Sequence, residues 1–343
     1  MENNYLTETL EKLVGIPSPS GFTEKAIRFV SEELQRYGYR PWITRKGACV
    51  VSLGGEGSPL VLNAHVDTLG AMVKSLKSNG RIEFTCIGGY TMFSVEGENC
   101  LIHTKTGRVL TGTIQSTSPS VHVFEDAGRK ERKLQNMEIR VDEIVKSKED
   151  LKKLGIEAGD FISIDPRFAI TATGFIKCRH LDDKAGVAVM LDLARRVKEE
   201  KLDIKRRVYL FFSAYEEVGH GASAGIPEEA EEIISIDMGA VGDTLESSEY
   251  AVSICAKDSN GPYDSRVVRA LVETARANSV DYTVDIYPFY GSDTGVSLRA
   301  GYDVRFGLLG PGVEASHAYE RTHIRALRNS SDLISHYVST SLV

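Results

Sequence analysis

The sequence has no run of about 18 apolar residues, the length that a membrane-spanning helix needs. Its first residues are acidic and include no apolar stretch of the kind found in secretory signal peptides. We therefore expect a cytoplasmic protein that is not embedded in a membrane. The net charge of −7 also argues against nucleic acid or an anionic membrane surface as the main partner.

Cysteine is scarce, and no two cysteines have the C-x-x-C spacing. The five that occur are an odd number, so they predict neither a complete disulfide framework nor a zinc–thiolate site. Buried, reduced thiols in a reducing compartment are the simpler interpretation. Other motifs are missing as well. The glycine-rich segment 307–312, which reads as a loop, lacks the Lys-Ser/Thr of a phosphate-binding loop, and no G-x-S-x-G elbow occurs.

The composition is that of a globular protein with a large core. Of 343 residues, 42% are apolar and 26% are charged, and the length suggests about two domains. Helical spacing of apolar residues occurs near the N-terminus and in several later segments. Predicted helices cover 23–37, 185–198, 265–277 and a stretch from about 330; predicted strands cover 48–53, 60–64, 208–214, 233–236 and 284–287.

The middle of the chain has a different character, with short alternating segments and frequent glycines. Strands are predicted at 81–86, 100–104, 108–114, 121–124 and 138–141. We therefore expect an α/β fold in which a mixed-sheet domain, residues 1–71 and 165–343, is interrupted by a small, barrel-like β-rich domain, residues 72–164.

Polar side chains follow three of the predicted strands. His65 and Asp67 come after the run LVLNA, Glu216 and Glu217 come after VYLFFSA, and Asp237 comes after IISI. Because sites in open α/β sheets form at the carboxyl ends of strands, we expect these side chains to lie at one edge of the sheet.

The types of these residues predict a metal site. Imidazole and carboxylate ligands without thiolate suit zinc, cobalt or manganese, and a shared carboxylate can bridge two ions. Asp182, in HLDDKAG just before a helix, is placed for bridging, whereas Asp183 is a candidate to cap that helix. Adjacent Glu216 and Glu217 point in different directions, so one can bind metal while the other acts as a general base.

Five segments in this order, AHVDTLG, LDDKAG, YEEVGHGAS, SIDMGAVGD and GSDTG, span nearly the whole chain. With them the sequence resembles the glutamyl/deblocking aminopeptidase family of dinuclear metallopeptidases, the tetrahedral aminopeptidases, also known as cellulase M. The resemblance implies that His65 and Asp237 bind one metal ion and Glu217 the other. It implies that Asp182 bridges the two ions and that Asp67 orients His65.

By the same resemblance Glu216 is the general base, and the last metal ligand is a late histidine. The chain departs from the family here, because SHAYERTH stands where an RYxHSPxE-like segment is common. His317, followed by Glu320, is the favoured ligand, and His323 is the alternative. A second departure is GSDTG in place of a GTDA-type sequence, where Asp293 is expected to shape the pocket near the substrate's N-terminus.

The leading hypothesis is an aminopeptidase with two divalent ions per subunit, zinc or cobalt before manganese, acting on peptides. The resemblance also implies that the β-rich insertion mediates subunit association and that the protein forms a dimer or a tetrahedral dodecamer. Alternatives are a metal-dependent amidohydrolase acting on N-acyl amino acids, a β-glucanase, and a degenerate, non-catalytic family member. Family members differ in preferring acidic, basic or neutral N-terminal residues, so the resemblance names no side-chain preference.

Overall fold

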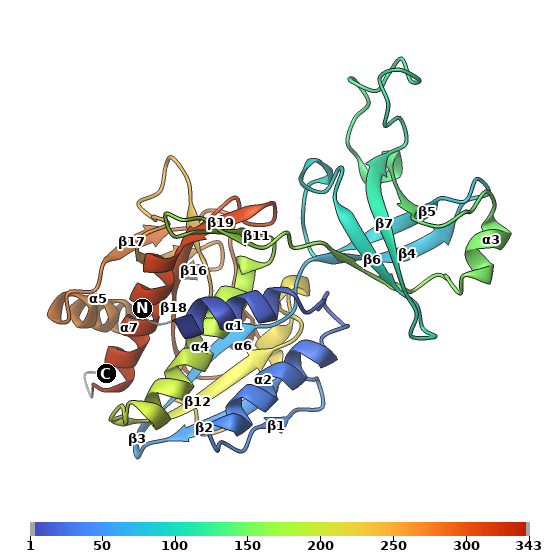
Figure 1. Ribbon diagram of the computed structural model, residues 1–343. Helices are drawn as coiled ribbons and strands as arrows, with labels where there is room; N and C mark the ends of the chain where they lie inside the picture. The colour runs from blue at the N-terminus through green and yellow to red at the C-terminus, as the bar shows by residue number, and fades with distance from the viewer. Residues whose placement is uncertain (1–3, 341–343) are drawn as a thin grey trace. The chain divides into compact units, whose positions relative to one another are not determined.

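The computed structural model describes residues 4–340 and divides the chain into two compact units (Figure 1). Unit 1 holds the chain up to Asp67 and from Arg167 onward, and unit 2 is Thr68–Pro166. Each unit has its own cluster of buried apolar side chains. Unit 1 contains a large mixed sheet covered by helices, and unit 2 contains a closed antiparallel barrel, which confirms the predicted fold class.

Four adjacent parallel strands form the centre of the sheet in unit 1. Their order is β12 (Arg206–Ser213), β3 (Gly57–His65), β13 (Glu232–Ile236) and β18 (Arg305–Glu314). Shorter strands extend the sheet on both sides: β1 (Trp42–Ile43), β2 (Cys49–Gly54), β10 (Ala169–Ile170), β11 (Phe175–Cys178), β14 (Gly239–Val241), β15 (Val252–Asp258), β16 (Gly261–Pro262), β17 (Tyr282–Ile286) and β19 (Glu320–His323). The carboxyl ends of the four central strands therefore meet at one edge.

Alternation along these strands supplies a core on each face of the sheet. In β3, Leu60 and Leu62 belong to the larger apolar cluster, whereas Val61 between them belongs to a second cluster. Five helices contribute to the larger cluster: α1 (Asn4–Val14), α2 (Glu24–Arg36), α4 (Leu181–Glu199), α5 (Ser265–Ala277) and α7 (Ile324–Val338). A sixth helix of unit 1, α6 (Asp293–Arg299), packs against the short turn η4 (Gly221–Ser223).

Unit 2 is a six-stranded barrel. Its strands are β4 (Gly70–Leu76), β5 (Ile82–Ile87), β6 (Asn99–His103), β7 (Val109–Ser116), β8 (Met137–Val141) and β9 (Phe161–Ile164), closed in the order β4-β5-β8-β7-β6-β9. The first and last strands are hydrogen-bonded neighbours, with Ala71 opposite Ile162. Short helical turns η1 (Met92–Ser94) and η2 (Leu134–Asn136) lie between strands, and Ser147 caps the short helix α3 (Lys148–Lys153).

Three predicted elements differ in the structure. Residues 121–124 form a turn with exposed side chains rather than a strand, and the last helix begins at Ile324 rather than near 330. The glycine-rich segment 307–312 is not a loop but lies within β18. Its glycines allow neighbouring backbone to approach closely, since a Cβ at Gly310 would lie 2.0 Å from the carbonyl oxygen of Asp237.

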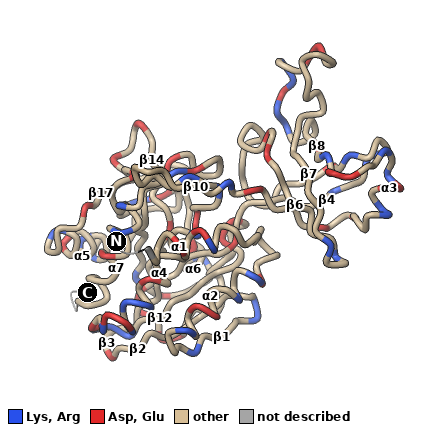
Figure 2. The backbone as a smooth tube through the Cα atoms, in the orientation of Figure 1, with Lys and Arg blue, Asp and Glu red and all other residues tan. Residues whose placement is uncertain are grey.

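Acidic and basic residues are mixed along both units (Figure 2). Neither unit shows a long stretch of basic residues, in keeping with the net charge of −7. Between residues 4 and 340, no helix combines the length and apolarity that crossing a bilayer requires.

Candidate active site and metal centre

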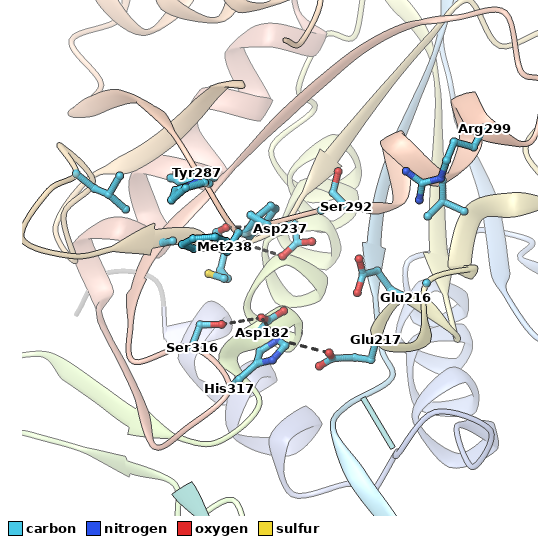
Figure 3. A pocket seen from close by; sticks show the side chains of 18 residues that line it. Asp182, Glu216, Glu217, Asp237, Met238, Tyr287, Ser292, Arg299, Ser316 and His317 are labelled. Carbon is cyan, nitrogen blue, oxygen red and sulfur yellow. Dashed lines mark hydrogen bonds and ion pairs between the residues drawn. The ribbon is translucent and has the colours of Figure 1, made fainter. Parts of the chain in front are cut away.

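The residues singled out from the sequence come together at the carboxyl edge of the central strands (Figure 3). His65 ends β3, and Asp237 follows β13 directly. The helical turn η3 (Glu216–Val218), just after β12, carries the adjacent glutamates, and β18 leads to His317. The fourth strand, which the sequence did not reveal, thus supplies the late histidine.

His65, Asp182 and Asp237 form a buried group whose ligand atoms all lie within 4.8 Å of one another. Nε2 of His65 is 3.1 Å from Oδ1 of Asp182. Nδ1 of His65 is 2.9 Å from the carbonyl oxygen of Asp67, which can only accept a hydrogen bond. The imidazole is therefore held with Nε2 directed at the two carboxylates, the orientation that a metal ligand needs.

A second group shares Asp182. Nε2 of His317 lies 3.4 Å from Oδ2 of Asp182 and 3.5 Å from Oε2 of Glu217 (Figure 3). The two oxygens of Asp182 therefore face different histidines, His65 on one side and His317 on the other. A carboxylate in this position can bridge two cations.

A further observation indicates that these donor groups fit divalent cations. Oε1 of Glu217 is buried and has no hydrogen-bond partner within residues 4–340. Burial first, and then the charge of Asp182, raises the pKa of Glu217 well above its usual range and that of Asp237 to about 7. Burial likewise raises the pKa of Glu216. Buried carboxylates held this close need compensating positive charge, which metal ions supply.

The pKa of His65 is also raised, but for a different reason. Burial lowers the pKa of His65, but a hydrogen bond to Asp182 and the charge of Glu216 outweigh it and raise that pKa well above its usual range. Burial would raise the pKa of Asp182, yet hydrogen bonds from His317 and His65 hold it below its usual range. Asp182 is therefore the carboxylate of the cluster that stays ionised most readily.

Asp67 contacts the backbone of the glutamate turn. Its Oδ1 accepts a hydrogen bond from the amide of Glu216 at 3.1 Å, and its Oδ2 accepts one from the amide of Glu217 at 3.2 Å. Ser20 donates its hydroxyl to Oδ2 as well. The family resemblance implied that Asp67 orients His65. In the structure its carbonyl contacts that ring, while its carboxylate fixes the two glutamates.

Asp183, the sequence's candidate helix cap, follows Asp182 and is fully buried. Its Oδ1 accepts a hydrogen bond from the amide of Gly186 at 3.0 Å, and its Oδ2 accepts one from the amide of His65 at 3.2 Å. The Asp182–Asp183 peptide bond is cis. Asp182 and Asp183 have non-helical φ/ψ within α4, so Asp183 caps the regular part of the helix that follows and links it to the end of β3.

The two late histidines have different surroundings. Nε2 of His323 donates to the carbonyl of Thr173 at 2.8 Å, and Nδ1 accepts from the amide of Arg325 at 3.1 Å. His323 therefore caps α7 with both ring nitrogens occupied. Glu320 lies between the late histidines in the sequence, and its Oε1 accepts from the amide of His317 at 3.1 Å. The structure brings His317, not His323, to the cluster.

Asp293 is buried under the turn that follows the glutamates. Its carboxylate accepts hydrogen bonds from Nδ2 of Asn63 at 3.0 Å, from the amide of Ala222 at 2.7 Å and from the hydroxyl of Ser213. The sequence led us to expect that Asp293 shapes the pocket, and in the structure Asp293 is not among the residues that line it. Its carboxylate instead links β3, β12 and η4 through these three hydrogen bonds.

A pocket of about 610 Å³ opens beside the cluster. The acids and His317 make up part of its lining. The rest of the lining was not foreseen from the sequence and includes Met238, Ala240, Leu245, Tyr287, Pro288, Phe289, Tyr290, Gly291, Ser292, Val296 and Arg299. The aromatic run YPFY at 287–290, just before GSDTG, was the one signal that could have indicated it. A cavity of this size is ample for an amino-acid residue.

Histidine and carboxylate side chains at the carboxyl edge of an α/β sheet, beside a pocket, are typical of metal-assisted hydrolases. The comparison with known proteins is more specific. The sequence model of the M42 glutamyl aminopeptidase family matches residues 47–333, and the chain belongs to this family. It is therefore a peptidase, a hydrolase of the aminopeptidase kind.

A curated relative agrees with this assignment, and solved structures share the fold. The chain is 45% identical over 338 residues, 98% of each chain, to "Putative aminopeptidase YhfE" of Bacillus subtilis (strain 168). A TET aminopeptidase from the marine sediment archaeon Thaumarchaeota archaeon SCGC AB-539-E09 has the same fold, with a TM-score of 0.89 at 18% identity, covering 98% of this chain and 97% of that one. The TET1 peptidase of Pyrococcus horikoshii, described as able to assemble into a tetrahedron or a large octahedral shell, has a TM-score of 0.86 at 22% identity, covering 96% and 98%.

Proposed function

We propose that this protein is a dinuclear metal-dependent aminopeptidase that removes N-terminal residues from peptides. The observation that carries the proposal is the placement of Asp182 between two histidines, with one oxygen toward each. The unpartnered Oε1 of buried Glu217 supports it.

The ligands follow from the two groups around Asp182. His65 and Asp237 would hold one ion, Glu217 and His317 the other, and Asp182 would bridge them. Nitrogen and oxygen donors without thiolate suit zinc or cobalt, with manganese as a further option. When bound, such ions supply Lewis acidity to the scissile carbonyl and to the attacking water.

Glu216 is the group placed to move protons. Its Oε2 lies 3.7 Å from Nε2 of His65, and its carboxylate lines the pocket. It would take a proton from the attacking water at Oε2 and deliver it to the leaving amine. Burial raises the pKa of Glu216, which brings the carboxyl nearer to the range that a general acid–base needs.

The arrangement of charge favours exopeptidase action. Glu216, Glu217 and Asp237 all line the pocket and present oxygens to its interior. The free ammonium group of a peptide's N-terminus would be attracted to these acids, whereas an acylated N-terminus carries no such charge. This favours the aminopeptidase over the amidohydrolase acting on N-acyl amino acids.

The larger assembly is part of the proposal. We expect the segment 72–164, which lies within the barrel unit, to mediate subunit association, and residues 1–71 with 165–343 to form the catalytic domain. The Pyrococcus horikoshii TET1 peptidase assembles into closed shells, and its fold matches this chain over 96% of its length. A cytoplasmic homo-oligomer, a dimer or a tetrahedral dodecamer, is the corresponding state here.

The test is hydrolysis of aminoacyl-p-nitroanilides by metal-stripped protein reconstituted with zinc, cobalt or manganese. Metal-dependent release of nitroaniline supports the aminopeptidase. Release from N-acetylated amino-acid amides alone would support the amidohydrolase, and a protein that binds no metal would support the non-catalytic alternative. Size-exclusion chromatography with light scattering gives the oligomeric state.

A further inference from the structure

Lys46 lies in the tight turn between β1 and β2, at the edge of the sheet where the glutamates lie. β2 runs antiparallel to β12, and its first residue, Cys49, pairs with Phe212 near the end of β12 (Figure 1). The turn is closed by a hydrogen bond from the amide of Thr44 to the carbonyl of Ala48 at 2.9 Å. Because the turn directly precedes Cys49, it lies beside the carboxyl end of β12.

The ammonium group of Lys46 is directed at the backbone that follows the glutamates. Its Nζ donates to the carbonyl oxygen of His220, to that of Gly221 at 3.0 Å and to the hydroxyl oxygen of Ser223 at 2.7 Å. A lysine ammonium has three hydrogens, so these contacts use all of them. Lys46 is not among the residues that line the pocket. It therefore holds the protein backbone and does not contact a substrate there.

His220 connects this contact to the glutamates. Its amide donates to the carbonyl of Tyr215 at 3.1 Å, and its ring stacks on that of Tyr215 with the centroids 5.0 Å apart. The segment 215–220 is thus closed by its two end residues, and both glutamates lie between them. Lys46 binds the carbonyl of one of these end residues, so it restrains the loop at the point where the loop closes.

The other anchors of this loop bind its amides. Asp67 accepts from the amides of both glutamates, and Asp293 accepts from the amide of Ala222 at 2.7 Å. Backbone carbonyls only accept hydrogen bonds, so they need a donor, which Lys46 provides. Burial lowers the pKa of Lys46, while the charges of Asp293 and Asp67 act in the opposite direction. The ammonium group is therefore within electrostatic reach of the two carboxylates that hold the amides.

The turn that carries this lysine is itself held in place. Ala48 belongs to the same buried apolar cluster as Ala222. A Cβ at Gly225 would lie 3.0 Å from Cγ2 of Thr44, so the turn and the segment after the glutamates are in close contact. A side chain that fixes a catalytic loop needs such a packed support.

We infer that Lys46 is a positioning residue whose ammonium group fixes the loop that places Glu216 and Glu217. Without it, the loop keeps its amide contacts to Asp67 but loses the restraint on its carbonyl side, and the carboxylate of Glu216 is displaced from the attacking water. This inference rests on the proposed aminopeptidase function. It adds to that function a residue that contacts neither substrate nor metal.

Lys46→Met tests the inference, because methionine keeps an unbranched side chain and lacks the ammonium group. We expect kcat with a cleaved aminoacyl-p-nitroanilide to fall by about 10- to 100-fold, since small displacements of a reacting group are costly. KM should stay within about twofold, because Lys46 does not line the pocket. Arg45→Met is the matched control, which removes the same charge from an exposed neighbour in the same turn and should leave kcat unchanged.

Chemical restoration separates the ammonium group from the bulk of the side chain. Cys86→Ser first removes the half-buried thiol, and Lys46→Cys is then alkylated with 2-bromoethylamine. The thiolate displaces bromide, which gives a side chain with the length and charge of lysine and sulfur in place of Cγ. This treatment should restore most of kcat, whereas 1-iodopropane, which adds an apolar group of the same size, should not.

Hydrogen exchange supplies a readout that does not depend on turnover. Lys46→Met should speed amide exchange in peptides that cover 215–223, measured by mass spectrometry. Exchange in the barrel strands should stay unchanged, which shows that the variant is folded. If the unaltered protein cleaves no p-nitroanilide with any metal, the proposed function fails, while the exchange rates still decide whether Lys46 fixes the loop.

Four results would overturn the inference. These are a kcat of Lys46→Met within about twofold of the unaltered enzyme, an equal loss with Arg45→Met, equal kcat after the two alkylations, and unchanged exchange in 215–223. A rise in KM at constant kcat would also contradict it, because Lys46 would then act as a substrate contact.

Discussion

Oδ1 of Asp67 lies 3.1 Å from the amide nitrogen of Glu216, and this contact links the end of β3 to the turn after β12. The other oxygen of Asp67 accepts the amide of Glu217 at 3.2 Å. One carboxylate therefore sets the position of both glutamates. The roles proposed for them, a proton carrier for Glu216 and a metal ligand for Glu217, would then depend on a residue that needs to touch neither substrate nor metal.

Asp67→Asn replaces one acceptor oxygen with an NH₂ group that faces donors. We expect kcat to fall by about 10- to 100-fold, because the turn carrying the glutamates loses its alignment. Steady-state kinetics with any cleaved p-nitroanilide measures the effect. Ser20→Ala, which removes only the hydroxyl donated to Asp67, should have a smaller effect. Unchanged kcat in Asp67→Asn would show that the turn is fixed by other contacts.

Glu216→Gln removes the proposed proton carrier while keeping the shape of the side chain. The expected loss of kcat is about 10²- to 10⁴-fold, the range typical of general acid–base groups. Metal content, measured by plasma mass spectrometry, should stay the same, because Glu216 is not a proposed ligand. Full activity would refute the assignment, and a loss of metal would make Glu216 a ligand instead.

The late histidines should respond differently to alanine. His317→Ala should reduce bound metal from about two ions per chain to about one. His323→Ala should keep both ions but lower the free energy of unfolding by about 1 kcal/mol, because His323 caps α7. Metal analysis beside urea denaturation distinguishes the two. Loss of metal in His323→Ala alone would reverse the choice of ligand.

Asp293→Ala tests the buried support under the glutamate turn. It leaves donors of Asn63, Ser213 and Ala222 without their acceptor, so we expect a loss of about 3 kcal/mol in the free energy of unfolding. Asp303→Ala is the matched control, because Asp303 is exposed and should change stability by less than about 0.5 kcal/mol. Equal stability of the two variants would contradict the role of Asp293.

Thiol reactivity checks the burial of the cysteines. Burial raises the pKa of Cys49, Cys100 and Cys255 to about 12, so at pH 8 these thiols are neutral as well as covered. Cys86 is half-buried, and burial raises its pKa too, so it should react first but more slowly than free cysteine.

Dithionitrobenzoate should therefore label native protein at one site, at a rate that rises with pH as the thiolate fraction grows. Peptide mapping identifies the labelled thiol, and Cys86→Ser should abolish the fast phase. Rapid labelling of Cys100 at pH 8 would show that the barrel opens.

The fold class and most residues of the cluster could be predicted from the sequence, because the end of a buried strand is marked by an apolar run followed by polar residues. Apolar runs that stop at His65, at the glutamate pair and at Asp237 are visible in a single chain. Their meeting at one edge follows from the geometry of parallel strands. No long-range information was needed for these three strands.

β18 was missed for a physical reason. Its glycines at 307, 310 and 312 suggest a loop. In the structure glycine is needed at 310 and 312 because other backbone segments come close. A Cβ at Gly312, for example, would lie 2.0 Å from the carbonyl oxygen of Ser248. Such a contact exists only after folding. The remaining lining of the pocket could not be predicted for a similar reason. Leu245, Tyr287 and Arg299 share no regular sequence spacing, and only the fold brings them to the same pocket.

The pairing of the first and last barrel strands, Ala71 opposite Ile162, has an evolutionary consequence. The chain enters and leaves unit 2 through two neighbouring strands, so the barrel is an inserted domain whose two ends are adjacent. Its internal loops can lengthen, shorten or change sequence without altering the register of β3 against β12 and β13. Selection can therefore remodel the surfaces of the barrel independently of the chemistry that begins at His65, three residues before Thr68, the first residue of unit 2.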